Sequence, residues 1–95
     1  MAAYIVFEIN VSDPSWRDGY LKPTADLVKK HGGRYLAVGP VEKMEGDRDP
    51  PDALVILEFP SAKAAKAWHG DVDYQPLIKL RWTGSTAEAL LVSGQ

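Results

Sequence analysis

The 95-residue sequence contains no cysteine. This excludes disulfide bridges, thiolate metal sites and thiol redox chemistry, and it fits a reducing cytoplasmic compartment. Long hydrophobic runs are also lacking, because Glu8, Asp13 and Glu58 interrupt or close the most apolar stretches, and none approaches the roughly 20 residues of a membrane-spanning helix. The residues after Met1 lack the basic region and cleavage site of a secretory signal. We therefore expect a cytoplasmic protein without a membrane segment.

Positive charge is equally sparse. Lysine and arginine together number 11 against 13 acidic residues, which gives a formal net charge of -2, and the lysines do not cluster. A protein that binds nucleic acid needs a basic surface for the phosphates, so this function is not expected. The sequence also has no glycine-rich phosphate loop, no nucleophile elbow and no histidine pair at metal-ligand spacing. It predicts no cofactor and no metal site.

What is present is the composition of an ordinary globular protein, with 45% hydrophobic and 25% charged residues. A chain of this length fits one domain, 1–95, and buries only about 60–65% of its unfolded surface on folding. We expect one packed domain whose stability is modest unless another surface contributes.

The first elements follow from periodicity. Apolar residues alternate over 3–11, which is the pattern of a half-buried strand. Asp13 and Pro14 then favour the start of a helix that continues to about His31. Pro23 removes a backbone donor from the middle of this helix and predicts a kink or a break there.

The rest of the chain yields five further segments. A strand over 34–45 has a bulge or bend at Gly39 and Pro40, and a solvated turn over 46–52 joins it to a strand over 53–59. A helix then begins at the cap Ser61 and ends at Gly70. A short helical stretch over 74–82 and a last strand over about 86–92 complete the chain. This β-α-β-β-α-β order predicts an α+β fold. Its four-stranded antiparallel sheet carries both helices on one face, with the first and third strands at the centre.

The predicted sheet is apolar on both faces. The odd positions of the first strand suit the face beneath the helices, yet Tyr4, Val6, Leu54 and Ile56 occupy the centre of the other face. We interpret this second apolar face as the contact surface of a homodimer. A monomer with its C-terminal segment folded over the sheet is the alternative.

Short segments spread over nearly the whole chain carry a family resemblance. They are Gly-Gly-Arg-Tyr-Leu at 32–36, Glu-Phe-Pro at 58–60, Ala-Lys-Ala-Trp at 65–68 and Tyr-Gln-Pro-Leu at 74–77 with Arg81. In these segments the chain resembles the domain-of-unknown-function 1330 family. The resemblance implies a ferredoxin-like fold of the dimeric α/β-barrel type, in which two sheets enclose an internal space. It implies no reaction, since the barrel relatives include cofactor-free monooxygenases, isomerases and haem enzymes.

Three polar residues of the central strands are candidates for a site in the dimer cleft. Glu8, Asn10 and Glu58 fall on the face opposite the helices, and burial of a carboxylate there would raise its pKa and suit it to act as a base. The alternative is a structural position near the strand ends. Glu8 and Glu58 lie toward opposite ends of antiparallel neighbours, so they are not expected to form a carboxylate pair within one subunit.

The histidines and arginines each have a structural and a functional interpretation. His31 and His69 end the two predicted helices, where an imidazolium favours the helix dipole, and a haem-ligand role stays open for either. Arg34 and Arg81 are suited to hold a carboxylate ligand through two parallel hydrogen bonds. A salt bridge is the alternative, for Arg81 with Asp71, Asp73 or Glu58.

Large aromatic residues allow the same two interpretations, since Tyr20, Tyr35 and Tyr74 with Trp16 and Trp68 suit either a core or a pocket wall. The sequence thus predicts a homodimer that binds a small organic ligand between the sheet and its partner. The alternative is a cofactor-independent enzyme, of monooxygenase or isomerase type, in the same cleft. The candidate ligand-binding residues are Glu8, Asn10, Tyr20, Arg34, Glu58, Tyr74 and Arg81; no catalytic residue is assigned.

Overall fold

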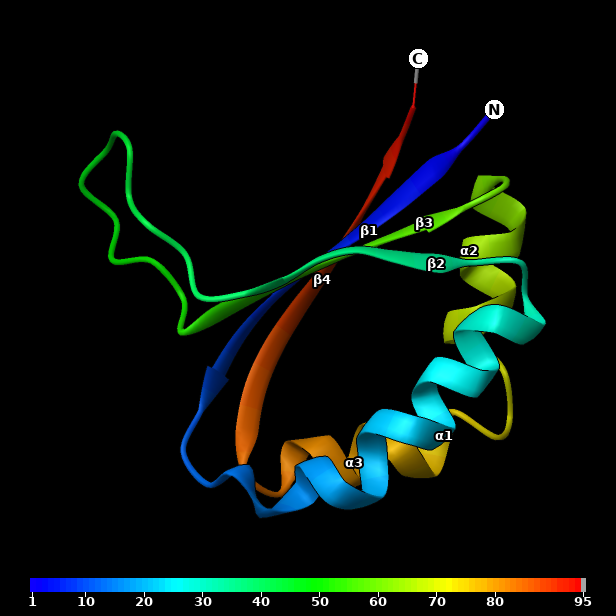
Figure 1. Ribbon diagram of the computed structural model, residues 1–95, viewed down its shortest axis with the longest axis horizontal. Helices are drawn as coiled ribbons and strands as arrows, with labels where there is room; N and C mark the ends of the chain where they lie inside the picture. Colours follow the sequence, from blue (N-terminus) through cyan, green and yellow to red (C-terminus); the bar gives the residue numbers. More distant parts are fainter. Residues whose placement is uncertain (95) are drawn as a thin grey trace.

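Residues 1–94, which the computed structural model describes, form an antiparallel sheet with α-helices on one of its faces (Figure 1). The elements in chain order are β1 (Ala3–Val11), the 3-10 turn η1 (Pro14–Trp16), α1 (Arg17–Lys30), β2 (Arg34–Gly39), β3 (Ala53–Phe59), α2 (Ala62–His69), α3 (Gln75–Trp82) and β4 (Ser85–Ser93). The strands are ordered β2-β3-β1-β4. The predicted α+β class and the central place of the first and third strands are confirmed.

Alternation along β1 determines which face of the sheet carries the core. Ala3, Ile5, Phe7 and Ile9 are buried on the helix side, while the residues between them point to the other face. Trp68 of α2 is fully buried against this row, with its ring centroid 6.0 Å from that of Phe7. The core therefore lies between the sheet and the helices, as the periodicity predicts.

Two predicted helix caps are present. Asp13 accepts a hydrogen bond from the backbone N–H of Ser15 at 3.0 Å, and this bond lowers the pKa of the Asp13 carboxyl. Ser61 accepts one from the N–H of Ala64 at 3.1 Å and begins α2. Both side chains satisfy backbone donors that a helix start otherwise leaves free.

The predicted helix over 13–31 differs from the structure in two respects. It opens as the 3-10 turn η1, and α1 then continues through Pro23 without a break. The prediction of a break was wrong because Pro23 lies on the exposed side of α1. The opposite side buries Tyr20, Thr24 and Val28, and this packing outweighs the lost backbone bond.

The second strand is shorter than predicted. β2 ends at Gly39, and its register shift lies between Tyr35 and Ala37 rather than at Gly39 and Pro40. Pro40 has no N–H to continue the ladder, so pairing stops there. Residues 40–52 form an arm that projects past the sheet on the side away from the helices (Figure 1).

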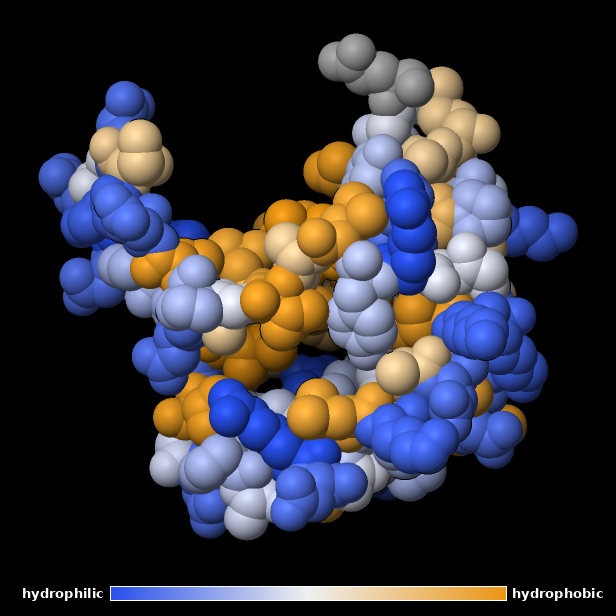
Figure 2. Space-filling model, in the orientation of Figure 1, coloured by the Kyte–Doolittle hydropathy of each residue, from blue (hydrophilic) through white to orange (hydrophobic). Residues whose placement is uncertain are grey.

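The second face of the sheet, which we call the open face, carries no helix in residues 1–94 (Figure 1). Val6 lies at its centre, opposite Ile56 of β3 and Leu90 of β4. Leu90 is 55% exposed. Figure 2 shows apolar side chains gathered over the sheet between the arm and the chain ends. None of the helices in this described part of the chain combines the length and hydrophobicity needed to cross a membrane.

Candidate ligand-binding site

A cavity of about 670 Å³ lies between the sheet and α1. Its volume falls within the range of about 300–1,000 Å³ that is typical of sites for small organic molecules. Figure 2 shows the hollow beneath the sheet, bordered by apolar side chains. The sheet contributes Phe7 and Val55 to its lining, while α1 contributes Tyr20 and Thr24. The cavity is formed by a single chain, on the helix side of the sheet.

Aromatic rings form much of the cavity wall. Trp16 of η1 meets Tyr20 edge to face with ring centroids 5.2 Å apart, and Trp68 of α2 meets Phe7 in the same way. Tyr35 of β2 lines the wall as well, and burial raises the pKa of its hydroxyl to about 12. The aromatic residues were interpreted as either core or pocket wall, and both interpretations hold. The buried rings of Trp16, Tyr20 and Trp68 belong to the core and also line the cavity.

Two tyrosines are joined behind this wall. The hydroxyls of Tyr20 and Tyr74 form a buried hydrogen bond of 2.6 Å. Burial raises the pKa of Tyr74, and Tyr20 raises it further, while the positive charge of Arg81 acts in the opposite direction. Tyr74 therefore stays protonated at neutral pH and serves as a hydrogen-bonding group rather than as a phenolate base.

Arg81 is buried beside these tyrosines. Arg81 is 3% exposed, and its guanidinium carbon lies 5.4 Å from the ring centroid of Phe7 and 5.8 Å from that of Tyr20. The predicted salt bridge to Asp71, Asp73 or Glu58 is not among the ion pairs of residues 1–94. That prediction was wrong because Arg81 lies on the buried side of α3 and points toward aromatic rings.

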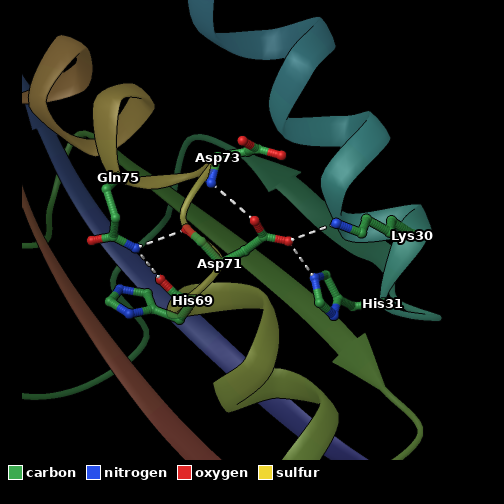
Figure 3. Close-up of polar contacts among 6 residues, drawn as sticks. All are labelled: Lys30, His31, His69, Asp71, Asp73 and Gln75. Carbon is green, nitrogen blue, oxygen red and sulfur yellow. Dashed lines mark hydrogen bonds and ion pairs between the residues drawn. The ribbon is translucent and has the colours of Figure 1, made fainter.

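The carboxylate of Asp71 instead holds the end of α1 (Figure 3). It is 7% exposed, and its Oδ2 accepts hydrogen bonds from His31 Nε2 at 2.8 Å and Lys30 Nζ at 3.1 Å. Its Oδ1 accepts from the N–H of Asp73 at 2.9 Å. The bond from His31, with smaller contributions from Asp73 and Lys30, lowers the pKa of Asp71. Asp71 thus ties α1, one wall of the cavity, to the connection between α2 and α3.

His69 also lies close to the core aromatic residues. Its ring centroid is 6.0 Å from that of Trp68 and 5.9 Å from that of Tyr74. Burial lowers the pKa of His69, and the charge of Arg81 lowers it further, so the imidazole is neutral at pH 7. Its backbone carbonyl accepts a hydrogen bond from the Gln75 amide at 2.9 Å (Figure 3).

Glu58 and Arg34 pair with each other on the open face. Arg34 Nε donates to Glu58 Oε1 at 2.7 Å, and the guanidinium is largely exposed. This hydrogen bond is the main reason why the pKa of Glu58 lies below its usual value. The expectation of a raised carboxylate pKa was therefore wrong for Glu58. A raised pKa needs apolar surroundings that disfavour the charged form, whereas Arg34 stabilises the charged form.

The other polar candidates on the open face are also paired. Glu8 accepts from Arg48 of the arm at 2.9 Å, and Asn10 Oδ1 accepts from the N–H of Asp52 at 3.0 Å. Glu8 lies opposite Leu54 in β3, well away from Glu58, as antiparallel pairing predicts. These contacts fasten the C-terminal half of the arm to β1.

The seven candidates do not form one site. Three of them lie on the helix side and four on the open face: Tyr20, Tyr74 and Arg81 in the first group; Glu8, Asn10, Arg34 and Glu58 in the second. The prediction that one cleft gathers them was wrong, because Tyr20, Tyr74 and Arg81 belong to the helical layer, whereas the other four point from the strands to the face that this layer does not cover. Sequence reasoning also missed Thr24, although its spacing from Trp16 and Tyr20 places it on the same side of the helix.

Solved structures with the same arrangement come from several bacteria. A protein of unknown function from Rhodopseudomonas palustris has a TM-score of 0.76 and 16% identity, covering 99% of this chain and 82% of the other. SnoaB, a cofactor-independent oxygenase from Streptomyces nogalater, has a TM-score of 0.70 and 14% identity, covering 99% and 93%. A dimeric protein of unknown function and ferredoxin-like fold from Bacteroides fragilis has a TM-score of 0.61 and 9% identity, covering 98% and 96%.

At these identities the similarity concerns the fold alone, which is ferredoxin-like. A comparison with curated proteins gives no significant match. The family model described as "Domain of unknown function (DUF1330)" matches residues 2–95. This match covers nearly the whole sequence and agrees with the resemblance in its short segments, so the chain belongs to the DUF1330 family.

Proposed function

We propose that this protein is a homodimer that binds a small, mostly apolar organic molecule in the cavity between the sheet and α1 of each subunit. The observation that carries this proposal is the cavity of about 670 Å³, whose wall is aromatic and apolar with a few polar groups. A largely apolar concave surface with few polar groups is the usual form of a small-molecule site. This cavity replaces the cleft between sheet and partner as the place where a ligand would bind.

The open face supports the homodimer. Its apolar centre consists of Val6 with Ile56 and Leu90, and a face of this kind is usually covered in a stable protein. The Bacteroides fragilis protein with the same fold is described as dimeric. A second copy that lays its own open face on this one would bury both apolar surfaces at once, as a two-fold contact requires.

Binding is better supported than catalysis. A cofactor-independent reaction needs a group that takes a proton from the substrate. Among the described residues that line the cavity, Asp52 is the carboxylate, and it already accepts a hydrogen bond from the N–H of Val11 at 2.8 Å. Of the two tyrosines at the wall, Tyr35 has a raised pKa that keeps it neutral, and the hydroxyl of Tyr20 is already hydrogen-bonded to that of Tyr74.

The binding proposal is tested with 2-naphthamide, a flat neutral probe, by isothermal titration calorimetry on the full chain. Ala53→Phe places a ring in the cavity, and we expect it to abolish the heat of binding seen with the unmodified protein. Ala89→Phe is the matched control, because Ala89 lines a separate hollow between α2 and β4. No binding to the unmodified protein, or equal loss in both variants, would contradict the proposal.

The dimer is tested separately by sedimentation velocity. Leu90→Glu puts a charge on the open face and should convert the dimer into a monomer at micromolar concentration. Val72→Glu is the control, since Val72 is 78% exposed in the connection between α2 and α3. A monomeric unmodified protein, or a dimer that Leu90→Glu leaves intact, would refute this part of the proposal.

A further inference from the structure

The guanidinium of Arg81 is a buried cation with unused hydrogen-bond donors. Its residue is 3% exposed, and neither Nε nor Nη1 has a hydrogen-bond partner. A buried charge is costly unless it is paired, and the nearby rings of Phe7 and Tyr20 return only part of that cost through cation–π contact. The fold therefore maintains an expensive group in which at least two nitrogens have no hydrogen-bond partner.

Other unpartnered polar atoms lie around the same cavity. Trp16 Nε1, Trp68 Nε1 and the Thr24 hydroxyl are buried without a hydrogen-bond partner, and all three residues line the cavity. An indole nitrogen only donates. Together with Arg81, these groups leave an excess of donors over acceptors in this part of the molecule. A ligand that completes them must supply acceptor oxygens.

Arg81 adjoins the cavity through its wall. Phe7 and Tyr20, the rings against which the guanidinium lies, are themselves lining residues. Asp52, an exposed carboxylate, also lines the cavity, so a negative group on the ligand is repelled there. Attraction at Arg81 and repulsion at Asp52 favour one orientation, with the charged end of the ligand innermost.

We propose that the ligand is a flat organic anion whose carboxylate or phenolate oxygen pairs with Arg81 while its ring system packs against Trp16, Tyr20 and Trp68. This inference rests on the proposed function, because it assigns a ligand class to the same cavity. A hydrogen bond from a guanidinium to an oxyanion is roughly twice as strong as one between neutral groups, and both Nε and Nη1 of Arg81 lack a partner. The aromatic wall favours a planar partner, since ring–ring contacts add to burial of apolar surface.

The test compares two probes of the same shape, 2-naphthoate and its neutral amide, 2-naphthamide, by calorimetry on the full chain at pH 7. A guanidinium forms a stronger hydrogen bond with a carboxylate oxygen than with a neutral amide oxygen. We therefore expect the carboxylate probe to bind at least about 10-fold more tightly than the amide. Arg81→Met should remove this preference and leave the affinity for the amide within about threefold. Arg17→Gln is the matched control, because Arg17 lines the cavity but is exposed, and it should retain the preference.

The outcomes separate the two proposals. If neither probe binds, the proposed function fails. If both probes bind equally to the unmodified protein, the cavity binds molecules but the assignment of an anion is wrong. That comparison needs no variant, so it remains decisive even if Arg81→Met does not fold. A preference for the carboxylate that survives Arg81→Met and is lost in Arg17→Gln would place the anion at the other arginine and overturn the inference.

Discussion

The hydrogen bond between Tyr20 and Tyr74 allows a quantitative test of the polar core behind the cavity. Its hydroxyl oxygens are 2.6 Å apart and buried. Tyr20→Phe leaves the Tyr74 hydroxyl without this partner, and Tyr74→Phe does the same to Tyr20. An unsatisfied buried polar group costs about 1–3 kcal/mol, so each variant should lower the free energy of unfolding by that amount. The double variant removes both hydroxyls and should cost less than the sum by about 1 kcal/mol or more.

The assay is urea unfolding followed by tryptophan fluorescence at a fixed protein concentration, with free energies from linear extrapolation. Tyr35→Phe is the control, because Tyr35 is 40% exposed; its effect should add to that of Tyr20→Phe within about 0.5 kcal/mol. Additive effects of Tyr20→Phe and Tyr74→Phe would show that the two hydroxyls do not depend on each other. That result would refute the reasoning.

Three further predictions concern the framework that holds the cavity. Ser61→Ala removes the cap of α2 and should lower the free energy of unfolding by about 1 kcal/mol in the same urea assay. Gly84→Ala places a Cβ against the backbone carbonyl oxygen of Asp13 and should lower the free energy of unfolding by about 1–3 kcal/mol. Gly19→Ala is the control, because its Cβ meets only a flexible side chain and should not destabilise the protein. Equal effects of the two substitutions would contradict this reasoning. The pKa of Asp71 is lowered on folding, so the unfolded chain binds the proton first as pH falls. The stability that Asp71 contributes is complete above about pH 4 and is lost as the pH falls below that value. Asp71→Asn should therefore make the urea midpoint fall less steeply between about pH 5 and 3. An equally steep fall in the variant would refute this prediction.

The parts of the fold that the sequence predicts are those set by local signals. The alternation in β1 identifies its buried face, and the side chains of Asp13 and Ser61 mark where helical turns begin. These signals act over two to four residues, so they are legible without knowledge of the rest of the chain. The break expected at Pro23 was wrong for the converse reason, since packing of the other side of α1 decides the outcome there.

The site depends on contacts between distant segments and was predicted only in part. Tyr20, Tyr74 and Arg81 were identified as candidates by residue type, but their grouping depends on where α3 packs against α1. The bond between His31 and Asp71 joins positions 40 residues apart in the sequence. The open face was predicted from its apolar residues, whereas the partners of its charged residues, Arg34 and Arg48, emerge from strand pairing and the course of the arm.

The central claim, that the cavity between the sheet and α1 is the ligand site, is tested most directly by the indole N–H resonances of the tryptophans. The sequence has three of these residues, of which Trp16 and Trp68 line the cavity and Trp82 is 62% exposed on α3. Titration of the ¹⁵N-labelled protein with 2-naphthoate should shift the resonances of Trp16 and Trp68 and leave that of Trp82 in place. Shifts confined to Trp82, or to residues of the open face such as Val6 and Leu90, would contradict the claim.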